Sequence, residues 1–179
     1  ILVEKSENNL VNITYKIDLG KKSKIKRITF IGNKVFKDKK LKRIITSSEY
    51  KFWKLISGRK YLNENSVILD ERLLKNFYKN NGYYNVKINP SFAKLIDQNN
   101  FELIFNINSG SKVSFGDLNL SLPSDFDEKN FNSIKTLFKK TKGKPYSINT
   151  IDKILDEIDT ITALEQYKFI KAKVIENID

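Results

Sequence analysis

The side chains behind most enzyme chemistry are missing from this sequence. Its 179 residues include no Cys, no His and no Met. Cys/His zinc sites, thiol nucleophiles and triads with an imidazole base each need Cys or His. Carboxylates remain, but Asp70 with Glu71 and Asp156 with Glu157 are adjacent on predicted helices, so the members of each pair point in different directions. We therefore expect a binding protein rather than an enzyme, without a metal site or a cofactor.

Positive charge is concentrated in the middle of the chain. The formal net charge is +12, and residues 21–110 alone hold 20 basic and 7 acidic side chains. Such a concentration suits a nucleic acid, an anionic lipid or an acidic partner, or it is ordinary solvated surface. The candidate basic face consists of Lys21, Lys22, Lys24, Lys26, Arg27, Lys39, Lys40 and Arg43.

An aromatic segment lies in the same charged region. Tyr50, Phe52 and Trp53 follow the first predicted helix of that region. They are a candidate anchor for a partner protein, because aromatic side chains dominate interface hot spots. The alternative is that they pack the long connection between two helices onto its own domain.

The sequence repeats itself at an offset of 90 residues. Residues 11–30 and 101–120 each alternate apolar and polar side chains on either side of a connection, with Gly20 matching Gly110. This pattern is typical of two strands joined by a loop. Matching phase on both sides of a matching glycine indicates a repeated unit. The matched apolar pairs are Val11 with Phe101, Ile13 with Leu103, Tyr15 with Phe105, Ile17 with Ile107, Ile25 with Phe115, Ile28 with Leu118, and Phe30 with Leu120.

The complete unit is predicted to run strand, helix, helix, strand, strand. After the strand ending at Phe30, Asp38 is expected to cap a first helix that extends to Ile45. A second helix begins near Asn65 and stops at Gly82, which tolerates positive φ. Strands follow over 83–93 and 101–107. In the second copy we expect strands over 115–122 and 167–175, with two helices between them that carry apolar residues from 131 to 138 and from 148 to 161.

The predicted fold class is α+β, with tandem β-α-α-β-β units that each form a three-stranded mixed sheet with two helices on one face. Residues 1–20 are the closing strand of a preceding unit, 21–110 a complete domain, and 111–179 a second domain lacking its last strand. The sequence starts without Met and ends abruptly, which suggests a fragment. No run approaches eighteen apolar residues, so we expect no membrane-spanning helix.

Two stretches carry a resemblance to a known family. KIKRITFIGNKVFKDKKL at 24–41 and YLNENSVILDERLLKNFYKNNGYYNVKI at 61–88 resemble the POTRA domains of the BamA family of outer-membrane assembly factors, and KFWKLISGRKY at 51–61 is similar to a helix connection in the third of these domains. The resemblance implies a periplasmic scaffold that receives unfolded outer-membrane β-barrel proteins by β-augmentation. It also implies accessory lipoproteins and a C-terminal membrane barrel of the same protein as partners, and no nucleic acid.

The sequence also indicates which strand is open to a client. Pro90 cannot donate to a ladder, so the strand over 83–93 is expected at an edge of the sheet, whereas 101–107 alternates without Pro or Gly and fits the centre. Main-chain pairing of an extended polypeptide would then use the free edge. Alternatively, Pro90 and Lys87 protect this edge against pairing. The candidate binding residues are Tyr83, Tyr84, Asn85, Val86, Lys87, Ile88 and Asn89.

Two other functions share this element order. Strand, helix, helix, strand is the order of KH domains, so a basic RNA-binding module is one alternative, although the G-x-x-G clamp of such domains is missing after Ile31 and Gly32. The other alternative keeps the POTRA fold and places it in a secretion transporter or a division protein.

Overall fold

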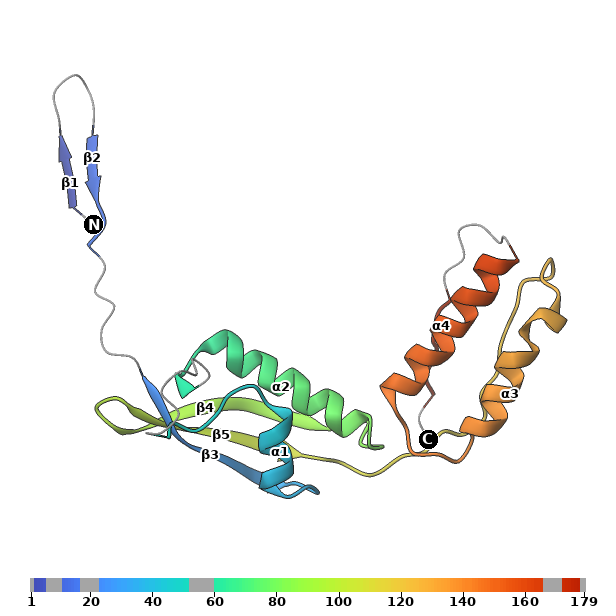
Figure 1. Cartoon of the computed structure of the whole chain (residues 1–179), viewed down its shortest axis with the longest axis horizontal. Helices are drawn as coiled ribbons and strands as arrows, with labels where there is room; N and C mark the ends of the chain where they lie inside the picture. Colours follow the sequence, from blue (N-terminus) through green and yellow to red (C-terminus); the bar gives the residue numbers. More distant parts are fainter. Residues whose placement is uncertain (1, 6–10, 17–22, 52–59, 166–171, 178–179) are drawn as a thin grey trace.

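The computed structural model describes residues 2–5, 11–16, 23–51, 60–165 and 172–177 (Figure 1). Within them the chain forms an N-terminal hairpin, a complete α+β unit and a second unit built around two helices. No helix in these ranges is long and apolar enough to cross a membrane. The complete unit consists of β3 (Lys24–Asn33), α1 (Asp38–Ile44), α2 (Glu64–Lys79), β4 (Lys87–Asp97) and β5 (Asn100–Asn108).

The sheet of the complete unit has the order β3-β5-β4. β5 pairs parallel with β3 and antiparallel with β4, so the sheet is mixed, as predicted. The last strand in sequence therefore occupies the centre, and β4 lies at an edge. Both placements agree with the expectation from Pro90 and from the uninterrupted alternation of 101–107.

The core lies between the sheet and the two helices. Leu103, Phe105 and Ile107 of β5 are completely buried, because alternate residues of a central strand face the helices. β3 departs from strict alternation: its register shifts between Ile25 and Arg27, and this bulge turns both Ile25 and Ile28 inward. The helices complete the core with Leu41, Leu74 and Tyr78.

The helix boundaries differ in detail from the sequence prediction. Asp38 is the first residue of α1 and not its cap; Lys37 occupies the cap position without a side-chain bond. The Asp38 carboxylate instead accepts a hydrogen bond from Lys34. Its negative charge in the first turn still interacts favourably with the helix dipole. α2 begins at Glu64, where the Asn63 side chain accepts from the Ser66 N–H at 3.1 Å. α2 ends at Lys79 with Asn80 as its C-cap, so Gly82, predicted to end the helix, lies in the following turn, where its φ is +96°.

The second unit contains the 3₁₀ helix η2 (Glu128–Phe131), α3 (Asn132–Thr141) and α4 (Ile148–Leu164). Its core consists of Phe131, Ile134, Ile154, Ile158 and Ile161. The strand predicted over 115–122 is wrong as secondary structure, although alternate residues Leu118, Leu120 and Leu122 pack against this core.

The strand predicted over 167–175 is also missing from its described part, residues 172–175. Both segments lack the pairing that forms the strands of the complete unit, where β3 and β4 each pair with β5. Ser114 bridges to Pro145, and Phe115 exchanges backbone hydrogen bonds with Gly143 and Lys144, each at 2.8 Å. Beyond these residues, 116–122 and 172–175 form no ladder with any described residue, so neither is a strand.

The N-terminal hairpin pairs β1 (Leu2–Lys5) antiparallel with β2 (Val11–Thr14). β2 falls within the closing strand expected over residues 1–20, of which 1, 6–10 and 17–20 lie outside the described residues. Val11, Ile13 and Tyr15 are each more than half exposed. Their alternation predicts a buried face, but no described residue covers it.

Candidate functional site

The two edges of the sheet are the first places to look for a binding site. An edge strand carries a row of backbone N–H and C=O groups without ladder partners, which is a template for another extended chain. Here the edges are β3 and β4. What covers each edge decides which of them is available.

The outer edge of β3 is occupied over its first half by residues of the connection between α1 and α2. The Tyr50 N–H donates to the Ile25 carbonyl at 2.7 Å, and the Leu62 N–H donates to the Ser23 carbonyl at 2.9 Å. Lys24 also forms an antiparallel bridge with Tyr61. Segments on both sides of residues 52–59 thus pair with β3 as a neighbouring strand would.

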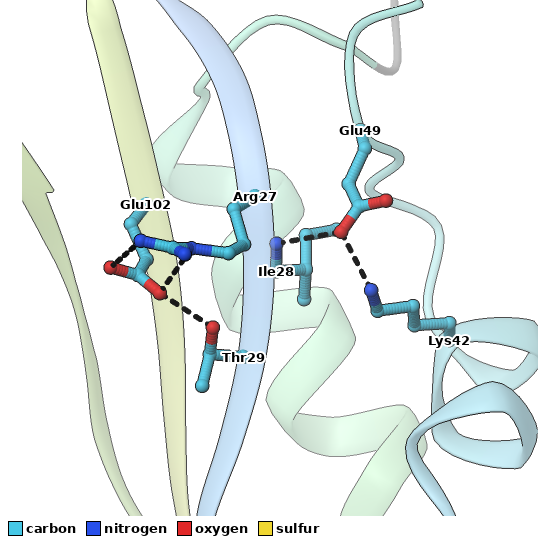
Figure 2. A network of polar contacts seen from close by, with 6 residues as sticks. All are labelled: Arg27, Ile28, Thr29, Lys42, Glu49 and Glu102. Carbon is cyan, nitrogen blue, oxygen red and sulfur yellow. Dashed lines mark hydrogen bonds and ion pairs between the residues drawn. The ribbon is translucent and has the colours of Figure 1, made fainter. Parts of the chain in front are cut away.

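A side chain completes this cover. Glu49 accepts a hydrogen bond from the Ile28 N–H at 3.0 Å and forms an ion pair with Lys42 at 2.6 Å (Figure 2). Burial raises the pKa of the Glu49 carboxyl, but the bonds from Lys42 and Ile28 outweigh it and leave this pKa below its ordinary value. The carboxylate is therefore held in its charged, accepting form at neutral pH.

The outer edge of β4 has no such cover among the described residues. β4 pairs with β5, and none of the backbone hydrogen bonds from described loops and turns reaches it. Its register with β5 shifts between Asn89 and Phe92, where Pro90 lies, and again between Leu95 and Asp97. The free edge therefore consists of two short regular stretches, Lys87–Asn89 and Phe92–Leu95.

The predicted binding strand begins too early. β4 starts at Lys87, so only Lys87, Ile88 and Asn89 of the seven predicted residues belong to it. The Val86 N–H donates to the Tyr83 carbonyl at 3.3 Å in a turn, and both side chains pack in or against the core.

The two remaining residues of the predicted strand lie outside it as well. Tyr84 contacts the second unit, and Asn85 is exposed in the turn. The physical reason is Gly82: its positive φ reverses the chain, and the following residues complete the turn before pairing starts.

The aromatic anchor is only partly described, because Phe52 and Trp53 lie outside the described residues. Tyr50 is half-buried, with the Lys24 and Lys60 ammonium groups 4.5 and 5.3 Å from the centre of its ring. Together with its backbone bond to Ile25, these contacts hold Tyr50 against its own domain. Tyr50 thus follows the packing interpretation.

The predicted basic residues do not gather on one face. Arg27 lies on the open face of the sheet, where it pairs with Glu102 at 2.8 Å, and Glu102 also accepts from the Thr29 hydroxyl at 2.6 Å (Figure 2). Helix α1 covers the opposite face and exposes Lys39, Lys40 and Arg43. Lys26 is exposed, Lys24 stacks on Tyr50, and Lys21 and Lys22 lie outside the described residues.

Two structurally important carboxylates were missed from the sequence. Nothing in the local pattern marks Glu49, because its partner Ile28 is 21 residues away. Asp70 is completely buried and accepts from the Thr46 N–H and hydroxyl, both at 2.6 Å. Asp70 precedes Leu74 and Tyr78 by four and eight residues, and this spacing places it on the same face of α2 as these two residues. The spacing therefore indicates that the Asp70 side chain is buried.

Comparisons with known proteins point in one direction. A family model described as POTRA, surface antigen variable number repeat, matches residues 23–110. The chain is 27% identical over 173 residues to the outer membrane protein assembly factor BamA of Neisseria meningitidis, covering 96% of this chain and 22% of that protein. The BamA of Buchnera aphidicola is 26% identical over 172 residues, covering 95% of this chain and 27% of that protein.

A solved structure shows the same fold. The crystal structure of Haemophilus influenzae BamA POTRA3-5 aligns with a TM-score of 0.54 at 17% identity, over 79% of this chain and 54% of that one. This chain spans only about a fifth to a quarter of the length of the curated relatives described above.

Proposed function

We propose that the complete unit, whose residues 23–110 match the POTRA family model and which resembles the BamA assembly factors, binds unfolded polypeptide along the outer edge of β4. The observation that carries the proposal is the inequality of the two sheet edges. Backbone bonds and Glu49 occupy the edge of β3 as far as Ile28, whereas no described residue occupies that of β4. A strand added to this sheet therefore extends it on the β4 side.

Pairing of this kind recognises backbone rather than side chains. An extended segment that adds to a sheet edge gains main-chain hydrogen bonds whatever its sequence. The two short stretches of β4, separated by the irregularity at Pro90, limit how many such bonds one client makes. Binding is then weak and reversible, which reconciles a receptive edge with a protected one.

The wider setting follows from the relatives. They are named outer membrane protein assembly factors, so we propose that the clients are unfolded outer-membrane β-barrel proteins met in the periplasm. In this role the chain is a non-enzymatic scaffold, and accessory lipoproteins and a membrane barrel of the same protein are its other partners. The division of the basic residues between opposite sides of the sheet does not favour nucleic acid.

Photo-crosslinking tests the choice of edge. Lys94 on β4 and Lys26 on β3 are both exposed lysines of edge strands, so each can be replaced by a photoreactive amino acid. Unfolded barrel peptides should crosslink to position 94 and not to position 26. Equal crosslinking from both positions, or crosslinking from position 26 alone, would overturn the proposal.

Proline substitution tests the main-chain mechanism. In an antiparallel pair, consecutive residues point their N–H groups alternately toward the partner strand and away from it. One of Lys94→Pro and Leu95→Pro therefore removes an outward N–H and leaves the ladder with β5 intact. That variant should keep its circular dichroism spectrum and lose peptide binding, while Leu95→Ala should retain binding. A folded proline variant at the outward position that binds peptides like the parent would refute backbone pairing.

A further inference from the structure

The turn between α2 and β4 does not face a client, because it contacts the second unit. Asn80, at the C-terminal end of α2, accepts from the Asn149 N–H at 2.9 Å and from the Ser147 hydroxyl at 3.0 Å. Its amide nitrogen donates to the Asn149 side chain at 3.1 Å. Ser147 is itself the N-cap of α4. The Asn80 side chain of the first unit thus provides a hydrogen-bond acceptor for donors in the first turn of α4 in the second unit.

Tyrosines from the two units meet beside this contact. The rings of Tyr84 and Tyr146 pack edge to face, with centroids 4.9 Å apart. Their hydroxyls donate to the two oxygens of Glu176, at 2.8 and 3.0 Å respectively. The bond to Glu176 raises the pKa of Tyr84, and burial together with Glu176 raises that of Tyr146, so both hydroxyls keep their protons and remain donors.

The connecting chain is fixed at the same place. The Val113 N–H donates to the Gly82 carbonyl at 2.8 Å, directly across the link between the units. A Cβ on Gly82 would stand 2.9 Å from Lys112 Cγ and 3.1 Å from the Val113 carbonyl oxygen. The link can pass this close only because Gly82 has no side chain.

These contacts are polar and mostly exposed, and the hydrophobic cores of the two units remain separate. Interfaces between domains allow relative motion unless they are large and apolar. We propose that Asn80 and Tyr84 form a releasable latch that selects one orientation of the second unit relative to the first. When the latch opens, the units turn about the link at Val113, whose N–H stays bonded to the Gly82 carbonyl and whose carbonyl accepts from the Tyr146 N–H at 3.0 Å.

This latch is independent of polypeptide binding. It involves the end of α2 and the turn before β4, whereas the proposed binding edge begins at Lys87. With the latch closed, the two units keep the one arrangement drawn in Figure 1. With it open, the angle varies while each unit keeps its own core.

Distance measurements between spin labels test the latch. The chain has no Cys, so Arg72→Cys on α2 and Lys153→Cys on α4 give two unique attachment points on exposed residues. The intact protein should show one narrow distance distribution by double electron–electron resonance. Asn80→Ala removes three cross-unit bonds and Tyr84→Phe removes one, and each lost bond should shift the ratio of closed to open forms roughly fivefold.

Matched controls separate the latch from general loosening. Asn76→Ala changes the same residue type one turn earlier on the exposed side of α2, and Tyr15→Phe removes an exposed hydroxyl far along the chain. Both should leave the distribution narrow. If Asn80→Ala unwinds α4, Tyr84→Phe decides the matter, because its hydroxyl bonds to no backbone group. A Tyr84→Phe distribution identical to that of the parent would overturn the proposal.

Discussion

The carboxylate of Glu49 lies across the outer edge of β3 and accepts the Ile28 N–H at 3.0 Å (Figure 2). A side chain thereby takes the place that a carbonyl of a neighbouring strand would occupy. Lys42 neutralises the charge that this substitution brings to the edge. The difference between the two edges depends in part on this one residue, since the edge of β3 is covered as far as Ile28 and no described residue covers that of β4.

Removing the Glu49 side chain should destabilise the complete unit. Glu49→Ala leaves the Ile28 N–H without its acceptor, and an unsatisfied buried donor costs about 1–3 kcal/mol. Urea unfolding should show this loss in the free energy of unfolding, with Glu64→Ala, an exposed glutamate of α2, as the control. A loss no larger than that of the control would show that the bond to Ile28 contributes nothing.

The same residue predicts a pH dependence. The folded-state pKa of Glu49 is lowered from its ordinary value of 4.5, so its contribution is present above pH 4.5 and is lost as the pH falls through the lower folded value. Acidification should therefore reduce the stability gap between the parent and Glu49→Gln. Thermal unfolding of both proteins from pH 7 down to pH 3 measures that gap, and a constant gap over this range would contradict the assignment.

Asp70 should be far more sensitive to substitution than its neighbour Glu71. Asp70→Ala leaves the N–H groups of Thr46 and Ser47 without an acceptor in the interior, at a cost of about 3 kcal/mol. Glu71→Ala removes only a partly exposed ion pair with Lys75, worth about 0.5 kcal/mol. Chemical unfolding of the two variants measures the difference, and comparable losses would refute the role of Asp70 in joining α1 to α2.

Replacing three glycines by alanine should lower the stability of the protein to three different degrees. Gly82→Ala combines a positive φ with close approach to Lys112 and Val113, so it should cost more than the roughly 1 kcal/mol of backbone strain alone. Gly143 has φ +79° but open space around it, so its alanine variant should lose only the strain. Gly116→Ala should be nearly neutral, since it has neither feature. Melting temperatures that do not follow the order 82, 143, 116 would disprove this ranking.

Local patterns were sufficient to predict the sheet of the complete unit. The alternation of Leu103, Phe105 and Ile107 marks a strand with one face in the core, and Pro90 excludes a central position for its own strand. Both features are properties of a few consecutive residues. For that reason the topology of β3, β5 and β4 could be predicted from the sequence.

Contacts between distant residues were beyond the reach of such patterns. Glu49 meets Ile28 over 21 residues, and Tyr84 meets Glu176 over 92, so no local spacing signals either pair. The early start predicted for β4 has a related origin. Tyr83 and Val86 pack in or against the core from a turn, and their apolar side chains resemble the alternation of a strand. The sequence pattern thus predicts the burial of these two side chains but not the turn conformation of their backbone.

The central position of the last strand has a consequence for how the unit folds. β3 and β4 never pair with each other, and Arg27 reaches its partner Glu102 across 75 residues of chain. Sheets that depend on such long-range pairing fold slowly, since the chain entropy lost on closing the loop precedes the gain from contacts. A chain that is synthesised from its N-terminus cannot complete this sheet until β5 has been made. Until then, the strand edges of β3 and β4 that later pair with β5 are available to other extended segments, so the sheet forms only after its last strand is present.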